Sequence, residues 1–305
     1  MGTQPGMSIP GEPAAAASTA GNRLTAAEIF RVAVQTGEDE LKRSSAGLAL
    51  SGVAAGLGMG LTGLGSAAIL AATGSHGATT HLLASLLYPL GFIVVVVGRA
   101  QLFTENTLFP VLLVLDRRRH VRNTLRLWAV VFVANVLGAL LFAVLAEKTS
   151  ALTGDVQTAL AALGRDTTSG GFGHIFWAGV LGGWIIALMA WLVSAARFTV
   201  GQVLLIYLMT FVVGAAHLAH CIAGSGEALS AVLAGRVPLG GYLLWLLAAT
   251  LGNTVGGVLI VSLLNYGQVV GSGAPGHGER PLAEIEDEAS ARNGAALRRY
   301  RRRPR

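Results

Sequence analysis

The residues most able to do chemistry stand in the middle of apolar sequence. The stretch Gly98 to Asn106 reads GRAQLFTEN and follows the apolar run YPLGFIVVVV, and His220 ends a second apolar run. Histidine exchanges a proton near neutral pH, and an ionisable group in hydrocarbon is costly unless it serves a water-lined path. The two stretches therefore predict facing elements of a pore, with His220 as a proton relay. The alternative for His220 is a core histidine bonded to a carbonyl group.

The composition places these polar residues in a membrane. Of 305 residues, 53% are hydrophobic and only 12% are charged, against about 25% charged in a soluble domain. Several apolar stretches reach the roughly 20 residues that span a bilayer. A single cysteine, Cys221, excludes an intramolecular disulfide and a multi-cysteine metal site. The sequence predicts an all-α integral membrane protein, not an enzyme, with no metal and no cofactor.

Six membrane spans are expected, at about residues 45–70, 82–115, 125–146, 172–194, 200–234 and 239–266. The second and fifth spans are too long for one straight crossing and hold polar residues at their centres, so we expect both helices to be broken. Loops are expected at residues 71–81 and 147–171. Arginine and lysine gather in alternate segments and in both terminal regions, which predicts a plasma (bacterial inner) membrane protein with both termini cytoplasmic.

The chain divides into three parts. Residues 1–43 form a cytoplasmic segment, disordered at first and then a short amphipathic helix that opens with a capping box at Thr25 and Glu28. Residues 44–268 form the transmembrane channel domain. Residues 269–305 form a basic cytoplasmic tail that we expect to be disordered. We interpret its arginines as an orientation signal next to the lipid bilayer and expect no nucleic-acid partner.

The spans also pair across the chain. Asn135 and Gly138 in the third span match Asn253 and Gly256 in the sixth, and the two interrupted spans are also three apart. A repeat of three spans must be inverted in the membrane, and matching interruptions point to a site at the repeat interface. We expect Asn135 and Asn253 to support the pore by bonding the broken backbone of neighbouring spans.

A passage of this kind favours a small anion or its conjugate acid. The free N–H groups at a broken helix attract anions. A bare anion crosses an apolar constriction at a far higher cost than its neutral acid. His220 at the narrowest point can supply the proton and take it back.

Three motifs, in order within about residues 40–268, resemble the formate/nitrite transporter family: LFTEN, HCIAG and LGNTVGG. The resemblance implies six helices per subunit in an aquaporin-like inverted repeat, a homopentamer with one pore per subunit, and passage of small monovalent anions such as formate, nitrite or hydrosulfide. It makes His220 the central histidine. It places Leu102, Phe103, Thr104 and Asn106 in the pore loop, where Leu102 and Phe103 fit a hydrophobic constriction.

The chain departs from the family pattern at several positions. Arg99 and Gln101 precede the loop, Glu105 replaces a small residue, Gly224 replaces an asparagine after the histidine, and Glu227 follows. Arg99, Glu105 and Glu227 either set the charge of a vestibule or are structural. In the structural interpretation, Arg99 pairs with Glu105 or with Glu227.

Other interpretations are open. His217 lies just before His220, and either supports it or packs in the core. A neutral-solute pore, for water, glycerol or urea, shares the repeat but needs no titratable histidine. An intramembrane hydrolase requires a nucleophile, for which Ser225 with His220 is a weak candidate. A non-conducting scaffold requires a blocked pore and a tail that binds a partner.

Overall fold

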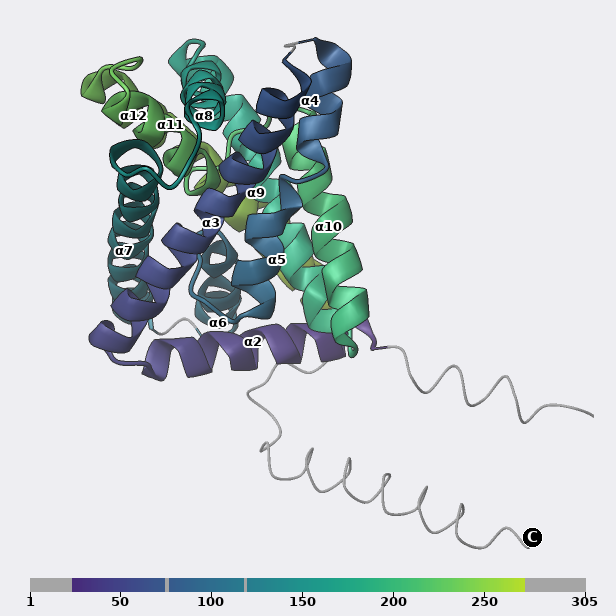
Figure 1. Cartoon of the computed structure of the whole chain (residues 1–305). Helices are drawn as coiled ribbons and strands as arrows, with labels where there is room; N and C mark the ends of the chain where they lie inside the picture. The colour runs from purple at the N-terminus through teal and green to yellow at the C-terminus, as the bar shows by residue number, and fades with distance from the viewer. Residues whose placement is uncertain (1–23, 75–76, 118–119, 272–305) are drawn as a thin grey trace, which may run out of the picture.

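The computed structural model describes residues 24–74, 77–117 and 120–271. The predictions for residues 1–22 and for most of the basic tail lie outside these residues. Within the described part, all the regular elements are helices (Figure 1). They are α2 (Ala26–Lys42), α3 (Ser45–Thr73), α4 (Ala78–Ser85), α5 (Pro89–Val97), η1 (Glu105–Thr107), α6 (Phe109–Arg117), α7 (Val121–Lys148), α8 (Gly154–Thr167), α9 (Phe172–Ala195), α10 (Thr199–Ala215), α11 (Ala223–Leu233), α12 (Leu239–Val255), η2 (Gly256–Ser262) and α13 (Leu263–Gly271).

Long apolar helices dominate the chain, as the composition predicted. In the described part, five helical segments are long and apolar enough to cross a membrane: Ser45–Thr73, Ala78–Val97, Val121–Lys148, Phe172–Ala195 and Leu239–Gly271. The fifth predicted span is not among them, because it consists of α10 with 17 residues and α11 with 11. The interruption between these helices, not a lack of apolar residues, keeps either of them from being a full-length span.

Both overlong spans are interrupted near their centres. In the second, α5 ends at Val97 and α6 begins at Phe109, with only the short η1 between them. In the fifth, α10 ends at Ala215 and α11 begins at Ala223. The second span has a further irregularity that we did not predict, a turn between α4 and α5 just before Pro89. Proline is tolerated there because it occupies the first turn of α5 and needs no N–H partner.

The amphipathic helix α2 lies across one end of the bundle (Figure 1). The predicted capping box is present: the N–H of Thr25 donates to Glu28 Oε2 at 2.8 Å, and the N–H of Glu28 donates to Thr25 Oγ1 at 3.3 Å. The hydrogen bond from the Thr25 backbone lowers the pKa of Glu28. At the other end of α2, Arg126 of α7 donates to the carbonyl oxygens of Leu41 and Arg43 at 3.0 and 3.2 Å.

The predicted loop at residues 147–171 is wrong, because most of it forms α8. This helix packs against α3 and α11. Gly164 makes the packing possible, since a Cβ there would collide with the backbone of Glu227 in α11. α8 lies at the end of the bundle opposite α2 (Figure 1).

The sixth span is also less regular than predicted, since a π-helical segment, η2, separates α12 from α13. The wider π-helical turn packs closely against η1, since a Cβ at Gly257 would collide with the side chain of Thr107. Ser262 Oγ also donates to the Thr107 carbonyl oxygen at 3.0 Å. η2 therefore packs directly on the broken segment of the second span.

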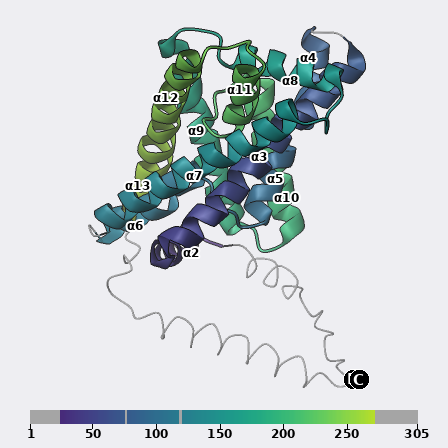
Figure 2. The same ribbon diagram turned by 60° about the vertical axis from the view of Figure 1, so that its left-hand side comes forward.

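The two ends of the described chain lie at the same end of the bundle. α12 and α13 run down to α6 and α2 (Figure 2), and α13 contacts both. The rings of Phe30 in α2 and Tyr266 in α13 have centroids 6.1 Å apart.

Candidate functional site

α5 and α10 end in the same backbone motif. The N–H groups of Arg99 and Ala100 donate back into the last turn of α5 at 3.2 and 3.0 Å, and those of His217 and Leu218 do so in α10 at 3.2 and 3.0 Å. Arg99 has a φ of 56° and His217 a φ of 53°. This left-handed position normally holds glycine, because a side chain there is strained. Both breaks thus begin at a strained residue with a nitrogen-rich side chain.

Asn135 holds the first break in place. Its Oδ1 accepts the N–H of Phe103 at 2.9 Å, and its Nδ2 donates to the carbonyl oxygens of Gln101 and Gly52 at 2.8 Å each. Buried backbone groups outside a helix need such partners. The hydrogen bonds that we predicted for this side chain are present.

Asn253 does the same at the second break. Its Oδ1 accepts the N–H of Cys221 at 2.9 Å, and its Nδ2 donates to the carbonyl oxygens of Ala219 and Gly179 at 2.8 and 2.9 Å. In both cases one amide bonds the break and a glycine in the neighbouring span. The two asparagines therefore have equivalent structural roles.

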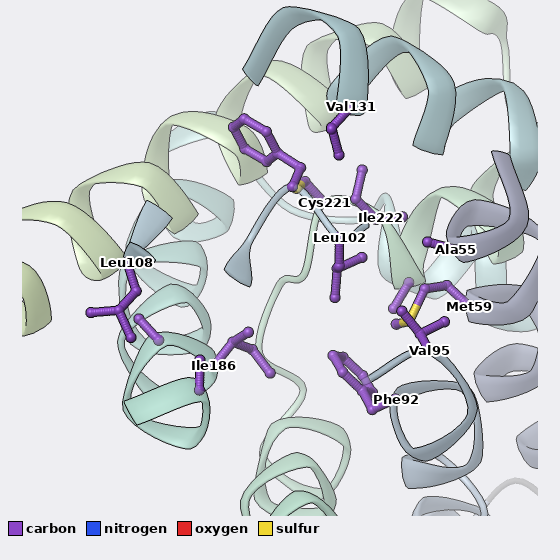
Figure 3. Close-up of a cluster of buried hydrophobic side chains, with 14 of the residues drawn as sticks. Ala55, Met59, Phe92, Val95, Leu102, Leu108, Val131, Ile186, Cys221 and Ile222 are labelled. Carbon is purple, nitrogen blue, oxygen red and sulfur yellow. The ribbon is translucent and has the colours of Figure 1, made fainter. Parts of the chain in front are cut away.

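A dry barrier lies between the two breaks. Leu102 and Phe92 are 0% exposed and His220 is 1% exposed. Figure 3 shows Leu102 between Ile222 and Phe92 in a buried apolar cluster. The ring of Phe92 meets the His220 ring edge-on, with centroids 5.0 Å apart.

Two cavities approach this barrier from opposite sides. The α2-side cavity has a volume of ≈ 260 Å³, and Leu102 lines it together with Thr36, Glu40, Arg99, Gln101, Glu105 and Asn106. The α8-side cavity has a volume of ≈ 860 Å³, and His220 lines it together with His81, Asp166, Thr167, His174, His217 and Glu227. Polar side chains therefore line a cavity on each side of the barrier.

His220 makes two hydrogen bonds that fix its ring. Its Nε2 lies 2.8 Å from Thr104 Oγ1, and its Nδ1 accepts the N–H of Ala223 at 3.0 Å. Because Nδ1 must offer a lone pair to that N–H, the proton of the neutral ring is on Nε2, and Thr104 accepts it. The hydrogen bond that joins the two breaks therefore carries an ionisable proton.

The other predicted loop residues have different roles. The ring of Phe103 points into α7 and packs edge-on against Phe132 and Trp128, with centroids 5.1 and 5.9 Å away. Phe103 therefore does not form the constriction with Leu102, and Phe92 takes that place. Asn106 Nδ2 donates to Gln101 Oε1 at 3.1 Å and to the carbonyl oxygen of Leu102 at 3.2 Å, so this side chain shapes the loop.

The predicted ion pairs of Arg99 are absent from the described chain. Arg99 and Glu105 line the same cavity but do not lie within the 4.0 Å of an ion pair. Glu227 lines the other cavity and accepts a hydrogen bond from Thr167 Oγ1 at 2.7 Å. The two predicted partners of Arg99 are thus on opposite sides of the barrier. Thr167 was missed because its segment was predicted to be a loop.

The described contacts also bear on two of the interpretations that the sequence left open. His217 does not contact His220 in the described structure, but stacks on His81 of α4 with ring centroids 3.6 Å apart. Ser225 is buried, donates to the Cys221 carbonyl oxygen at 2.6 Å and lies 3.1 Å from the Tyr242 hydroxyl. It has no hydrogen bond with His220 among the described contacts, so the hydrolase alternative has no catalytic pair.

Sequence comparison agrees with this geometry. The family model described as formate/nitrite transporter matches residues 27–267. The chain belongs to the formate/nitrite transporter family. It is 33% identical over 239 residues to the inner membrane protein YfdC of Escherichia coli strain K12, covering 77% of this chain and 76% of that protein. It is 28% identical over 214 residues to a probable formate transporter of Methanothermobacter thermautotrophicus, covering 65% and 78%.

Solved structures show the same fold. A channel described as an FNT family ion channel superposes with a TM-score of 0.65 at 21% identity, over 79% of this chain and 95% of that one. A pentameric formate channel with formate bound superposes with a TM-score of 0.62 at 20% identity, over 75% and 99%. Family membership and the apolar helices together establish a membrane protein of the channel and transporter class.

Proposed function

We propose that this chain is a channel or transporter for a small monovalent anion or its conjugate weak acid, with formate, nitrite and hydrosulfide as candidate solutes. The 2.8 Å contact between Thr104 and His220, within a dry barrier that separates two cavities, carries the proposal. The relative named a probable formate transporter and the channel with formate bound support it.

The physical problem is the crossing of the barrier. A charged solute loses its hydration between Leu102 and Phe92, whereas the neutral acid loses far less. We assign the proton exchange to His220 Nε2. The anion takes the Nε2 proton of the doubly protonated ring, which leaves the ring neutral with its hydrogen on Nδ1, and the neutral acid crosses. Beyond the barrier the acid gives the proton back to Nε2, so the ring is charged again and the solute leaves as the anion.

This relay has a structural requirement. In this exchange Nδ1 carries hydrogen both in the charged ring and in the neutral ring that remains after Nε2 has given up its proton. The bond from the Ala223 N–H to Nδ1 must therefore stay open until the ring returns to its resting form. Ala223 is the first residue of α11, where a small displacement frees its N–H without breaking a bond within that helix. Proton exchange at His220 therefore involves the beginning of α11.

The proposed architecture is six crossings in two inverted repeats. Arg99 and His217 occupy the same position in their breaks, and Asn135 and Asn253 bond equivalent backbone groups. His217 follows Arg99 by the same number of residues as Asn253 follows Asn135. In this arrangement Leu102 and Thr104 face His220 across the interface between the repeats.

The proposed assembly is a homopentamer, as in the pentameric formate channel. Leu82, Leu86, Leu90 and Val94 form an exposed apolar stripe at a four-residue spacing along α4 and α5, suited to lipid or a neighbouring subunit. Both termini are proposed to be cytoplasmic, because α2 and α13 share one end of the bundle and basic residues gather there.

The test is solute uptake into proteoliposomes at external pH values from about 5 to 8, the range in which histidine titrates. Formate, nitrite, hydrosulfide, acetate and urea are compared for wild type, His220→Ala and the control His120→Asn, a change in an exposed residue before α7. We expect anion or weak-acid uptake that depends on pH and is lost only in His220→Ala. Urea uptake indifferent to pH and to His220 would instead identify a neutral-solute pore. If none of the solutes were taken up, the result would favour the alternative of a non-conducting membrane scaffold.

A further inference from the structure

We infer that Arg99 is the anion-capture residue of the α2-side cavity, and that its ligand class is a small planar oxyanion such as a carboxylate. The inference rests on the proposed function and extends it from anions in general to oxyanions. Arg99 lines the cavity just outside the barrier residue Leu102.

The backbone at Arg99 gives the first reason. Its φ of 56° is in the left-handed region, where glycine has no strain and arginine does. Strain of this kind persists at functional sites when a side chain is needed at that place. His217 holds the equivalent position in the second break with a φ of 53°, and its ring lines the α8-side cavity. Each cavity thus receives a nitrogen-bearing side chain at its strained position.

The surroundings of the guanidinium give the second reason. In the described part of the chain, the Arg99 side chain makes no hydrogen bond and no ion pair within 4.0 Å, and the residue is exposed in the cavity. Of the two carboxylates that line this cavity, Glu40 is bound by Arg43 at 3.0 Å. Glu105 lines the same cavity but does not lie within 4.0 Å of the guanidinium. The guanidinium therefore keeps its donors for a solute.

A second donor lies beside it. The Oε1 of Gln101 accepts from Asn106 Nδ2 at 3.1 Å, which leaves the Gln101 NH₂ group as the end available to the cavity. A guanidinium presents parallel N–H groups that match two coplanar oxygens, whereas an ammonium acts as a point charge. Formate, nitrite and acetate fit this set of donors better than chloride or hydrosulfide.

The experiment compares three variants in planar bilayers, with the solute added to one chamber at a time. Arg99→Gly removes the positive charge and the backbone strain. Arg99→Lys keeps the charge and the strain but loses the paired N–H groups. His217→Gly removes the backbone strain at the equivalent position on the other side of the barrier. Half-saturating concentrations for formate, nitrite and chloride are measured from each side, and the melting temperature is measured for each variant.

We expect Arg99→Gly to raise the half-saturating formate and nitrite concentrations about tenfold from the α2 side, with a melting temperature equal to or above that of the wild type. Arg99→Lys should bind all three anions but lose the preference for formate and nitrite over chloride. His217→Gly should leave the α2-side values unchanged. A stable Arg99→Gly with wild-type formate half-saturation, in a channel whose flux still depends on His220, would overturn this inference alone. Absence of anion flux in the wild type would overturn the proposed function as well.

Discussion

Thr104 Oγ1 and His220 Nε2 lie 2.8 Å apart, although the two residues are 116 positions apart and belong to different breaks. Each break is held by its own asparagine, so the contact joins two independently supported loops. It lies in a barrier that neither cavity crosses. The arrangement places one titratable group, and one hydroxyl bound to it, where a solute must lose its water.

The hydroxyl of Thr104 should matter more than its shape. Thr104→Val keeps the volume but leaves the His220 Nε2–H without a partner, at a cost of about 1–3 kcal/mol. We expect anion flux to fall by roughly tenfold in this variant, which corresponds to about 1.4 kcal/mol. Thr104→Ser retains the hydroxyl and should keep most of the flux. Wild-type uptake by Thr104→Val would show that the hydrogen bond has no role in passage.

Loss of either asparagine should disrupt the fold to a similar extent. Asn135→Ala removes three hydrogen bonds to buried backbone groups. Asn253→Ala removes two such bonds and a third to the part-buried carbonyl oxygen of Ala219. An unsatisfied buried group costs about 1–3 kcal/mol, so each variant should lose several kcal/mol of stability. Thermal unfolding in detergent, followed by size-exclusion chromatography, measures the loss. A large loss at one position and none at the other would contradict equivalent roles for the two residues.

Gly164 should tolerate no side chain. A Cβ there would collide with the Glu227 carbonyl oxygen, so Gly164→Ala must separate α8 from α11. We expect a destabilisation of about 1–3 kcal/mol, the usual cost of overpacking. Gly154→Ala, in the same helix, is the matched control because nothing lies within 4 Å of its added Cβ. Equal melting temperatures for the two variants would show that the α8–α11 contact does not constrain the fold.

The start of α2 should be sensitive to acid. The pKa of Glu28 is lowered in the folded chain, first by the hydrogen bond from the Thr25 backbone, so its stabilising effect is present above the unfolded value near 4.5. That effect is lost as the pH falls through the lower, folded value. Amide hydrogen exchange at the first turn of α2 should therefore show protection that weakens on acidification. Glu28→Gln can keep the capping geometry without a charge. In this variant the exchange protection of the first turn of α2 should not change as the pH falls through the pKa of Glu28. The same acid dependence in Glu28→Gln would contradict this assignment.

The sequence was most informative where a local pattern had one physical solution. A polar stretch inside an overlong apolar span can lie in a membrane only where protein or water satisfies its backbone. That argument located both breaks, and the Asn-x-x-Gly motifs pointed to Asn135 and Asn253 as the side chains beside them. The capping box at Thr25 likewise marked the start of α2 at the correct residue.

The sequence-based predictions that were wrong concern features that depend on contacts between distant segments of the chain. α8 has little apolar character, and its position is set by Gly164 packing on α11, so the segment was mistaken for a loop. Without α8, Thr167 was not available as the partner of Glu227. Phe103 and Phe92 are both apolar residues near the break, and only the packing of α7 on the loop decides which one reaches His220.

The most direct test of the account measures solute and proton movement together. A membrane potential is applied to vesicles that contain wild type or His220→Asn, and formate uptake, current and internal pH are recorded as the external pH falls from about 8 to 5. We expect wild-type formate uptake to rise on acidification, as the protonated form of His220 becomes more populated, and His220→Asn to lose that rise along with most of the flux. Formate uptake that is equally fast, with the same pH dependence, in His220→Asn would contradict a proton exchange at this residue.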